Sequence, residues 1–180
     1  MTAVFVDRDG VINENRDDYV KSLEEFKLLP GVVRSAARLT EAGLRIVIIS
    51  NQQGIARGLI SPEALRLIDE RLLAELAGAG ARVAGVYYCP HAKEDNCDCR
   101  KPRPGLLLKA AAELGIDLAR SVFVGDSSID IQAGVAAGCR TVLVLTGKTA
   151  PDQVSGLSPL PDHVARNLSE AVDWILQFST

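Results

Sequence analysis

Hydrophobic residues gather in five short runs along the chain, each about the length of one strand. The runs cover residues 3–7, 44–50, 83–89, 121–126 and 141–146. They are rich in valine and isoleucine, and they do not alternate with polar residues. That pattern is typical of strands covered on both faces, so it predicts buried strands.

Segments with helical spacing separate these runs. Apolar residues three or four positions apart predict helices over residues 32–42, 62–76, 107–114, 131–137 and 168–175. Ser61 and Pro62 give the second helix a cap and a first-turn proline, and Gly115 ends the third. Strands that alternate with helices imply an α/β fold with a doubly wound, Rossmann-like parallel sheet. Residues 147–163 are rich in Pro, Gly and Ser and are expected to form a loop.

Length and composition fit a single globular domain over residues 1–180, with 47% hydrophobic residues and a net charge of −3. No basic face dominates, which argues against a nucleic-acid partner. No apolar run is long enough to span a membrane, and the start of the chain lacks a signal-peptide pattern. We therefore expect a cytoplasmic protein. It should be a monomer, because neither a heptad repeat nor a large unexplained apolar face is present.

Polar residues follow three of the predicted strands at the point where each strand ends. They are Asp7 and Asp9 after the first strand, Ser50, Asn51 and Gln52 after the second, and Asp126 after the fourth. The carboxyl ends of parallel strands share one edge of the sheet, and ligands bind in the crevice there. These residues, far apart in sequence, should therefore converge.

Their chemistry suits phosphoryl transfer assisted by a metal ion. Residues two apart in an extended segment point to the same side, so Asp7 and Asp9 can share a site while Arg8 points away. Together with Asp126 they offer the oxygen ligands that Mg²⁺ prefers. The ammonium group of Lys101, with the donors after the second strand, would cradle a phosphate. A carboxylate can attack phosphorus and form an aspartyl-phosphate.

Three of the four cysteines cluster with a histidine. The cluster consists of Cys89, His91, Cys97 and Cys99. Three thiolates and one imidazole form a closed tetrahedral set, which is typical of structural zinc. The zinc would order a loop that has few apolar residues of its own. Because Arg100 and Lys101 follow directly, the zinc-binding loop should hold both at the site.

Four stretches of the chain, in this order, resemble the four motifs of the haloacid dehalogenase (HAD) superfamily of phosphatases. They are VFVDRDGVIN, VIISNQQGIARG, CRKPRPG and VFVGDSSIDIQAG, and together they cover nearly the whole chain. The resemblance implies one HAD-like phosphatase domain. The short segments after Gly10 and Asn51 leave no room for the large cap domain that many members insert. The first motif usually has Thr where this chain has Val11.

The resemblance also implies roles for individual residues. Asp7 would be the nucleophile, and Asp9 the general acid and base. Ser50 would bind the phosphoryl oxygens, and Lys101 would neutralise their charge. Asp130 would support the site through a contact with Lys101. The ligands of Mg²⁺ would be Asp7, the backbone carbonyl of Asp9, and Asp126.

Within the superfamily, the zinc-loop pattern resembles two branches. One removes the 7-phosphate of D-glycero-D-manno-heptose 1,7-bisphosphate in the heptose nucleotide pathway of lipopolysaccharide and related surface polysaccharides. The other acts on histidinol phosphate. The stretches NQQGIARG, YYCPH, CRKPRPG and LTGK favour the heptose branch and leave its preferred anomer, α or β, open.

The heptose branch implies a set of substrate contacts. The residues are Asp7, Asp9, Asn15, Tyr19, Ser50, Asn51, Gln52, Gln53, Arg100 and Lys101. The guanidinium group of Arg100 suits the phosphate at the far end of the sugar. Some relatives have a lysine at the position of Ser127, whose role therefore stays open.

Two other classes of protein share part of this pattern. A receiver-type signalling domain also gathers carboxylates, a hydroxyl and a lysine around Mg²⁺ at strand ends. Its phosphorylated Asp lies on a later strand, however, whereas the acidic pair here follows the first. A zinc-ribbon binding module would carry two CxxC-type knuckles and a basic surface, and the sequence has neither. The pattern therefore favours the hydrolase.

Overall fold

The computed structural model describes residues 2–177, and its centre is one six-stranded sheet. The strands are β1 (Ala3–Val6), β2 (Arg45–Asn51), β3 (Val83–Cys89), β4 (Val122–Gly125), β5 (Arg140–Val144) and β6 (His163–Ala165). Their order across the sheet is β3-β2-β1-β4-β5-β6, and every pairing is parallel. The predicted parallel sheet is confirmed.

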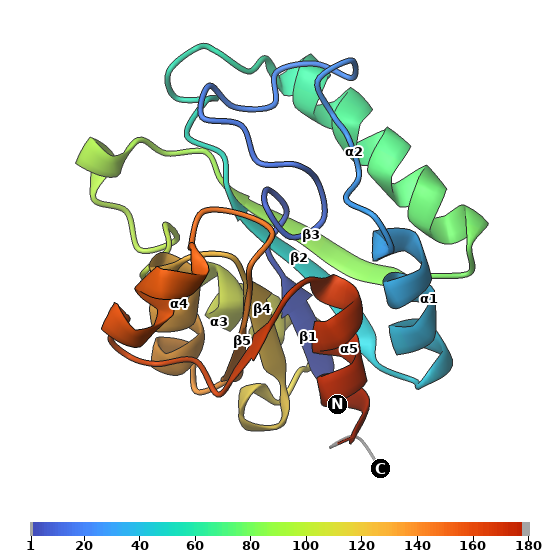
Figure 1. The fold of residues 1–180 in the computed structure, drawn as a ribbon. Helices are drawn as coiled ribbons and strands as arrows, with labels where there is room; N and C mark the ends of the chain where they lie inside the picture. Colours follow the sequence, from blue (N-terminus) through green and yellow to red (C-terminus); the bar gives the residue numbers. More distant parts are fainter. Residues whose placement is uncertain (1, 178–180) are drawn as a thin grey trace.

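Helices cover both faces of this sheet (Figure 1). They are α1 (Val32–Glu41), α2 (Pro62–Gly78), α3 (Gly105–Leu114), α4 (Ser128–Ala137) and α5 (Leu168–Gln177). Val4 and Val6 lie in the same core cluster as residues of α1, α2 and α5. Phe5, between them, lies in the cluster that contains residues of α3 and α4. This alternation confirms the doubly wound α/β fold, and each fully buried side chain of this size contributes roughly 1.5–3 kcal/mol.

The strand order places a crevice beside β1. The chain runs from β1 outward to β3 and then crosses back to β4, on the other side of β1. Between β1 and β4 the connections diverge to opposite faces, which opens a crevice at the carboxyl ends of these two strands. Asp7 follows β1 and Asp126 follows β4, so the topology sets these two carboxyl groups across the crevice.

The segments that carry cap domains in many HAD proteins are short here, as predicted. Within residues 2–177, the stretches 7–31 and 52–61 hold only turns, bends and isolated bridges. None of the helices in the described part of the chain is both long enough and apolar enough to cross a membrane.

The start of α4 and the segment before α5 differ most from the prediction. Helix α4 begins at Ser128, earlier than the apolar spacing indicated, because Ser127 caps it and Asp130 bonds back to the cap. The stretch predicted as a loop leads into β6, a three-residue strand that starts at His163. The His163 ring stacks on Trp174 of α5 with centroids 5.0 Å apart. An edge strand this short is too brief to show a periodic pattern.

Candidate active site

Three carboxyl groups form the floor of the site at the crevice. Asp7, Asp126 and Asp130 each place one oxygen within 4.8 Å of the others, and all three residues are buried. The Nζ atom of Lys101 lies 2.9 Å from Asp7 Oδ1 and 2.6 Å from Asp130 Oδ1. The predicted contact between Asp130 and Lys101 is therefore present, and one buried ammonium group offsets part of the repulsion among three carboxyl groups.

Crowding shifts the pKa values of these groups. Burial raises the pKa of Asp7 to about 6 against the opposing charge of Lys101. Burial and then the charges of Asp7 and Asp130 raise the pKa of Asp126 to about 8. For Asp130, burial works in the same direction, but the ammonium group of Lys101 holds its pKa below the usual range. A divalent cation would relieve this repulsion.

Two glycines allow the backbone to close around Asp126. Gly10 has a φ of 86°, and a Cβ atom there would lie 2.4 Å from Asp126 Oδ2. A Cβ atom on Gly147 would lie 1.9 Å from the same oxygen. The backbone N–H of Lys148 donates to this oxygen at 2.7 Å. The backbone and three carboxyl groups thus form a tight oxygen-lined cradle, which fits a small, hard cation such as Mg²⁺.

Asp9 is held by a ring of donors beside this floor. Arg8 Nη2 donates to both of its carboxyl oxygens, at 3.2 and 3.1 Å. Asn13 Nδ2 and Gln52 Nε2 donate to one oxygen each, at 2.8 and 2.7 Å. Although burial opposes it, the Arg8 guanidinium holds the pKa of Asp9 below its usual range, with help from Asn13 and Gln52.

Arg8 was expected to point away from the site shared by Asp7 and Asp9, yet its guanidinium group bonds Asp9. Strict alternation of side chains holds only within a strand, and β1 ends at Val6. Beyond it the chain turns at once, because Val11, Ile12 and Asn13 all bond back to the carbonyl of Arg8. That turn brings the guanidinium group of Arg8 onto the neighbouring carboxyl group.

The end of β2 is joined to the loop that carries the basic residues. Asn51 Nδ2 donates to the Lys101 carbonyl at 3.2 Å, and the Lys101 N–H donates back to Asn51 Oδ1 at 3.1 Å. Arg100 Nη2 donates to Gln53 Oε1 at 3.0 Å. Ser50 lies buried at the same strand end. These bonds fix the basic loop against the sheet.

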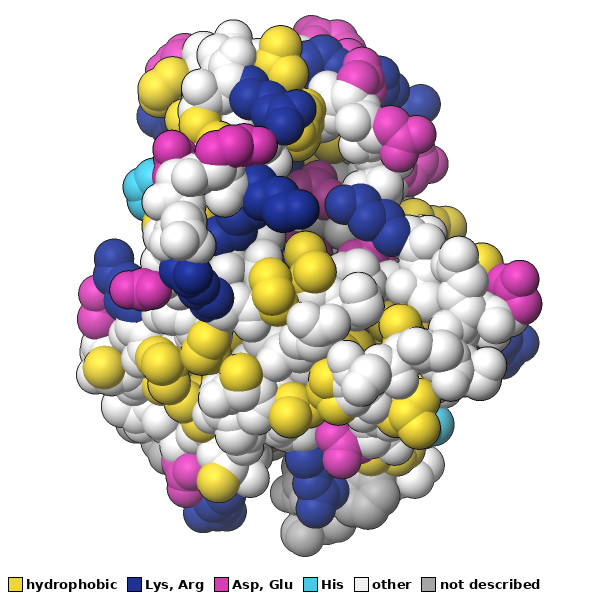
Figure 2. Space-filling view, turned by 90° about the vertical axis from the view of Figure 1, so that its left-hand side faces the viewer, with side chains coloured by type: hydrophobic (Ala, Val, Ile, Leu, Met, Phe, Trp, Pro, Cys, Tyr) yellow, Lys and Arg dark blue, Asp and Glu magenta, His cyan; other side chains and the backbone are white. Residues whose placement is uncertain are grey.

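A cleft of about 210 Å³ opens over this floor. Every side chain that the sequence placed at the substrate lines it, namely Asp7, Asp9, Asn15, Tyr19, Ser50, Asn51, Gln52, Gln53, Arg100 and Lys101. Arg16, Ser127 and Lys148 also line it. Arg16 lies between the predicted contacts Asn15 and Tyr19, and Lys148 ends the LTGK stretch, but neither was itself predicted to contact the substrate. In Figure 2, acidic side chains lie recessed in a hollow that Lys and Arg side chains flank. A larger cavity beside Leu44 and Val122 has no acidic residue in its described lining.

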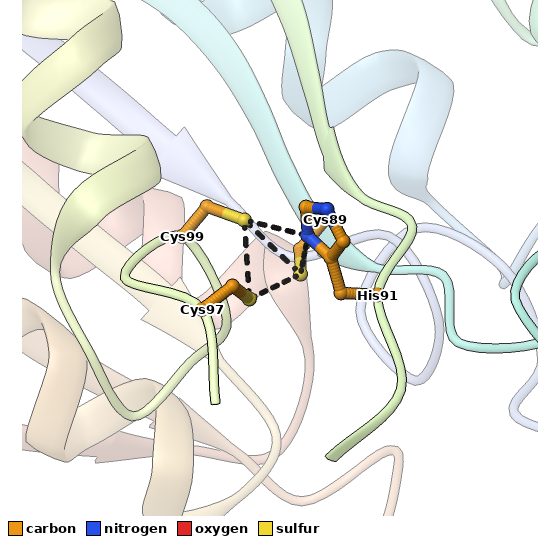
Figure 3. Close-up of side chains that lie close together, drawn as sticks. All are labelled: Cys89, His91, Cys97 and Cys99. Carbon is orange, nitrogen blue, oxygen red and sulfur yellow. Dashed lines mark hydrogen bonds between the residues drawn. The ribbon is translucent and has the colours of Figure 1, made fainter. Parts of the chain in front are cut away.

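The four predicted zinc ligands gather beside the cleft (Figure 3). The sulfur–sulfur distances among Cys89, Cys97 and Cys99 are 3.3–3.6 Å. His91 Nδ1 lies 3.2 Å from the Cys99 sulfur and 3.7 Å from the Cys89 sulfur. Tetrahedral zinc with Zn–S bonds near 2.3 Å has edges of roughly 3.8 Å, so the four donor atoms fit one ion. All four cysteines of the chain are free thiols.

The fold and this acidic cleft define a hydrolase of the HAD type, and the sequence agrees. A family model described as HAD-hydrolase-like matches residues 98–171. This match includes Lys101, Asp126 and Asp130, and the nucleophile predicted from the first motif lies outside it.

Comparison over the whole chain is more specific. The D-glycero-beta-D-manno-heptose-1,7-bisphosphate 7-phosphatase of Bordetella bronchiseptica is 39% identical over 98% of this chain and 99% of its own. The protein of the same name from Pseudomonas aeruginosa is 44% identical over 81% and 82%. The chain therefore belongs to the family of D-glycero-beta-D-manno-heptose-1,7-bisphosphate 7-phosphatases. This confirms the resemblance inferred from the four motifs and the choice between the two branches.

Solved structures lead to the same family. The crystal structure of D,D-heptose 1,7-bisphosphate phosphatase from B. bronchiseptica, complexed with magnesium and phosphate, matches with a TM-score of 0.91 and 38% identity. It covers 98% of this chain and 99% of that one. The corresponding structure from Burkholderia thailandensis matches with a TM-score of 0.74 and 32% identity, over 98% of this chain and 99% of its own.

Proposed function

We propose that the protein is a Mg²⁺-dependent phosphomonoesterase that removes the 7-phosphate of D-glycero-beta-D-manno-heptose 1,7-bisphosphate, a reaction of lipopolysaccharide precursor synthesis. The observation that carries this proposal is the convergence of Asp7, Asp126 and Lys101 at the crevice of a chain related to these phosphatases over nearly its full length. The names of the relatives supply the beta anomer, which the sequence motifs left open.

The acidic floor is the proposed magnesium site. Its ligands are Asp7, the backbone carbonyl of Asp9, and Asp126. The close approach of the carboxyl groups and the glycines around Asp126 support this assignment. Bound Mg²⁺ would neutralise charge on the phosphoryl group and help to orient it for attack by Asp7.

The reaction then runs in two displacements at phosphorus, with Asp7 first as the nucleophile and then as the leaving group. A carboxylate oxygen of Asp7 attacks phosphorus, the bond to the sugar oxygen breaks, and Asp9 donates a proton to that oxygen. Asp9 next accepts a proton from the water that attacks the aspartyl-phosphate, which releases inorganic phosphate and restores Asp7. Ser50 and Lys101 bind the phosphoryl oxygens throughout. The ion pairs of Lys101 with Asp7 and Asp130 keep its ammonium group in reach.

The distal phosphate is bound by cations at the rim of the cleft. Arg16 is paired with Asp18 and Glu25, and Lys101 belongs to the floor. Among the described lining residues, Arg100 bonds only neutral acceptors, and no carboxylate pairs with Lys148. The positive charges of Arg100 and Lys148 are therefore not neutralised by a carboxylate of the cleft, and they can bind a second phosphate. Lys148 would supply the charge that Ser127 lacks.

The cluster of Cys89, His91, Cys97 and Cys99 is proposed to hold structural zinc. It closes the loop between β3 and α3, and Cys99 directly precedes Arg100 and Lys101. We further propose that residues 1–180 act as one phosphatase domain in the cytoplasm.

The test compares substrates on the purified protein. With Mg²⁺, phosphate release from heptose 1,7-bisphosphate should occur with a higher kcat/KM than release from histidinol phosphate. Asp7→Asn should abolish turnover of both. A preference for histidinol phosphate would overturn the substrate assignment, and an active Asp7→Asn variant would overturn the nucleophile.

A further inference from the structure

Arg8 is a buried charge whose ionic partner in the described part of the chain is Asp9. Its side chain is fully buried, and Nη2 bonds both oxygens of Asp9. Its Nε and Nη1 atoms are buried without a hydrogen-bond partner in the described structure. A buried ion pair of this kind adds little net stability, because removing both charges from water costs about as much as their attraction returns. The ion pair therefore affects the position of the Asp9 carboxyl group more than the free energy of unfolding.

An aromatic ring holds the guanidinium group in place from the other side. The Arg8 Cζ atom lies 5.6 Å from the centroid of the Tyr88 ring, within the range of a cation–π contact. Tyr88 is on β3, and its hydroxyl donates to Asp69 Oδ1 on α2. A continuous chain of contacts thus runs from α2 through β3 to the carboxyl group of Asp9.

The remaining donors to Asp9 are also buried and anchored. Asn13 bonds the Glu14 carbonyl as well as Asp9, and Gln52 bonds Ser50 Oγ at 3.0 Å as well as Asp9. The side chain of Asp9 itself stays 23% exposed, and the residue lines the cleft. A carboxyl group that faces the cleft is therefore held from behind by side chains that solvent barely reaches.

We propose that Arg8, held by Tyr88 and Asp69, is a positioning residue that keeps the carboxyl group of Asp9 aimed at the leaving oxygen. The inference rests on the proposed role of Asp9 as the general acid. In that step the Asp7–phosphorus bond forms, the bond from phosphorus to the sugar oxygen breaks, and a proton that Asp9 has taken up from solvent passes to that oxygen. Arg8 is not among the residues that line the cleft, and it acts on the reaction through the carboxyl group of Asp9, to which it is bonded.

The consequence is a dependence on the leaving group. A sugar alkoxide leaves poorly without a proton, whereas p-nitrophenolate leaves without one. General acid catalysis contributes about 10²- to 10⁴-fold when it is needed. Misplacing the Asp9 carboxyl group should thus slow hydrolysis of a sugar phosphate far more than hydrolysis of p-nitrophenyl phosphate. A purely structural role of Arg8 would slow both alike.

The experiment measures kcat/KM for both substrates, since this quantity reports the steps through phosphoenzyme formation. Arg8→Met should lower the ratio of sugar phosphate to p-nitrophenyl phosphate by about tenfold or more, and Arg8→Lys should recover part of it. Asp9→Asn should give the largest fall in this ratio. The matched control is Arg45→Met, since Arg45 donates to the Leu114 carbonyl away from the cleft, and it should leave the ratio unchanged.

The outcomes separate this inference from the proposed function. An equal loss on both substrates in a folded Arg8→Met variant would overturn the inference, and so would discrimination in Asp9→Asn without any in Arg8→Met. If Arg8→Met fails to fold, the same ratio is measured in Tyr88→Leu. This variant removes the aromatic ring beside Arg8 and keeps the Arg8–Asp9 ion pair. The ratio can be measured with any alkyl phosphate that the enzyme accepts, so rejection of heptose 1,7-bisphosphate alone counts only against the proposed substrate.

Discussion

At the scale of single residues, the carboxyl groups on the floor of the cleft couple metal binding to the release of protons. Burial is the largest cause of the raised pKa values of Asp7, about 6, and Asp126, about 8. Asp130, whose pKa the ammonium group of Lys101 holds down against burial, stays ionised over the same range. Protons and a divalent cation therefore compete for the first two groups.

This competition predicts that Mg²⁺ stabilises the protein more at pH 8 than at pH 5. From about pH 4 to 8 Asp7 and Asp126 of the metal-free folded protein keep protons that the unfolded chain has released, so the contribution of these two groups to stability falls as the pH rises. Mg²⁺ replaces those protons, and the rise in Tm that it causes should grow with pH. Thermal unfolding in EDTA and in excess Mg²⁺ at both pH values measures this. An equal rise in Tm at pH 5 and pH 8 would contradict this prediction. Asp126→Asn should make the rise in Tm depend less on pH.

The free cations at the rim should set the preference for two phosphates over one. Replacing Arg100 or Lys148 with Gln removes one charge that no carboxylate pairs within the described cleft. Because contacts to charged groups at partly exposed sites are modest, we expect kcat/KM for the bisphosphate to fall roughly 3- to 10-fold relative to heptose 7-phosphate. Lys109→Gln, on α3, is the matched control. An unchanged ratio in both variants would place the distal phosphate elsewhere.

At the scale of elements, the cysteine cluster ties the end of β3 to the loop that presents the basic residues. Cys89 is the last residue of β3, and Cys99 lies two positions before Lys101. The loop between them holds one short 3-10 helix, and Arg103 bonds residues 96–98 of it. A bound metal ion would add to this order and would act on the site through the placement of the loop.

Cys97→Ser should therefore lower both the bound zinc and kcat/KM. The loss of one thiolate opens the tetrahedral set, and Arg100 and Lys101 lose their fixed position. Metal analysis alongside steady-state kinetics tests both effects. Cys139→Ala is the control, because Cys139 lies outside the cluster and should keep the zinc. Unchanged kinetics after loss of zinc would show that the loop holds its position without metal.

Helix α2 offers a test of stability separate from activity. The Ser61 side chain accepts a hydrogen bond from the Ala64 N–H at 3.0 Å and caps this 17-residue helix. Ser61→Ala should lower the free energy of unfolding by about 1 kcal/mol, whereas Ser61→Asn should keep most of it. Urea denaturation measures the difference, and kcat should not change. Equal stability of the two variants would mean that the cap is not needed.

At the scale of the whole molecule, the strand order builds the site. Residues of β1 and β4 that are more than a hundred positions apart in sequence become neighbours because β1 pairs with both β2 and β4. The carboxyl groups that follow these strands meet at the point where the connections diverge. Loops then close around the site without an inserted cap domain in the described part of the chain.

The expectation of a monomer stays a prediction. The exposed large apolar residues in the described part of the chain are Leu23, Leu59, Leu67, Leu73, Leu108, Val135, Leu160 and Val164, from several different elements. A stable dimer needs a contiguous interface. Sedimentation velocity at micromolar concentration should show one species with the mass of a single chain, and a stable dimer would refute this.

The sequence by itself determined five of the six described strands, the five helices and the polar residues at the strand ends. It could do so because these features depend on local spacing: buried parallel strands need unbroken apolar runs, and their ends are where polar groups can reach a ligand. Asp7, Asp126 and the cysteine cluster could therefore be named before their distances were known.

Only the tertiary structure decided the contacts that depend on how the chain turns after a strand. Arg8 meets Asp9 because the chain folds back at Val11 to Asn13, and Lys148 reaches the cleft because Gly147 lets the backbone pass close to Asp126. Strand β6 is fixed by its neighbours β5 and α5 rather than by a pattern of its own. Such contacts join segments whose separation in space no local period encodes.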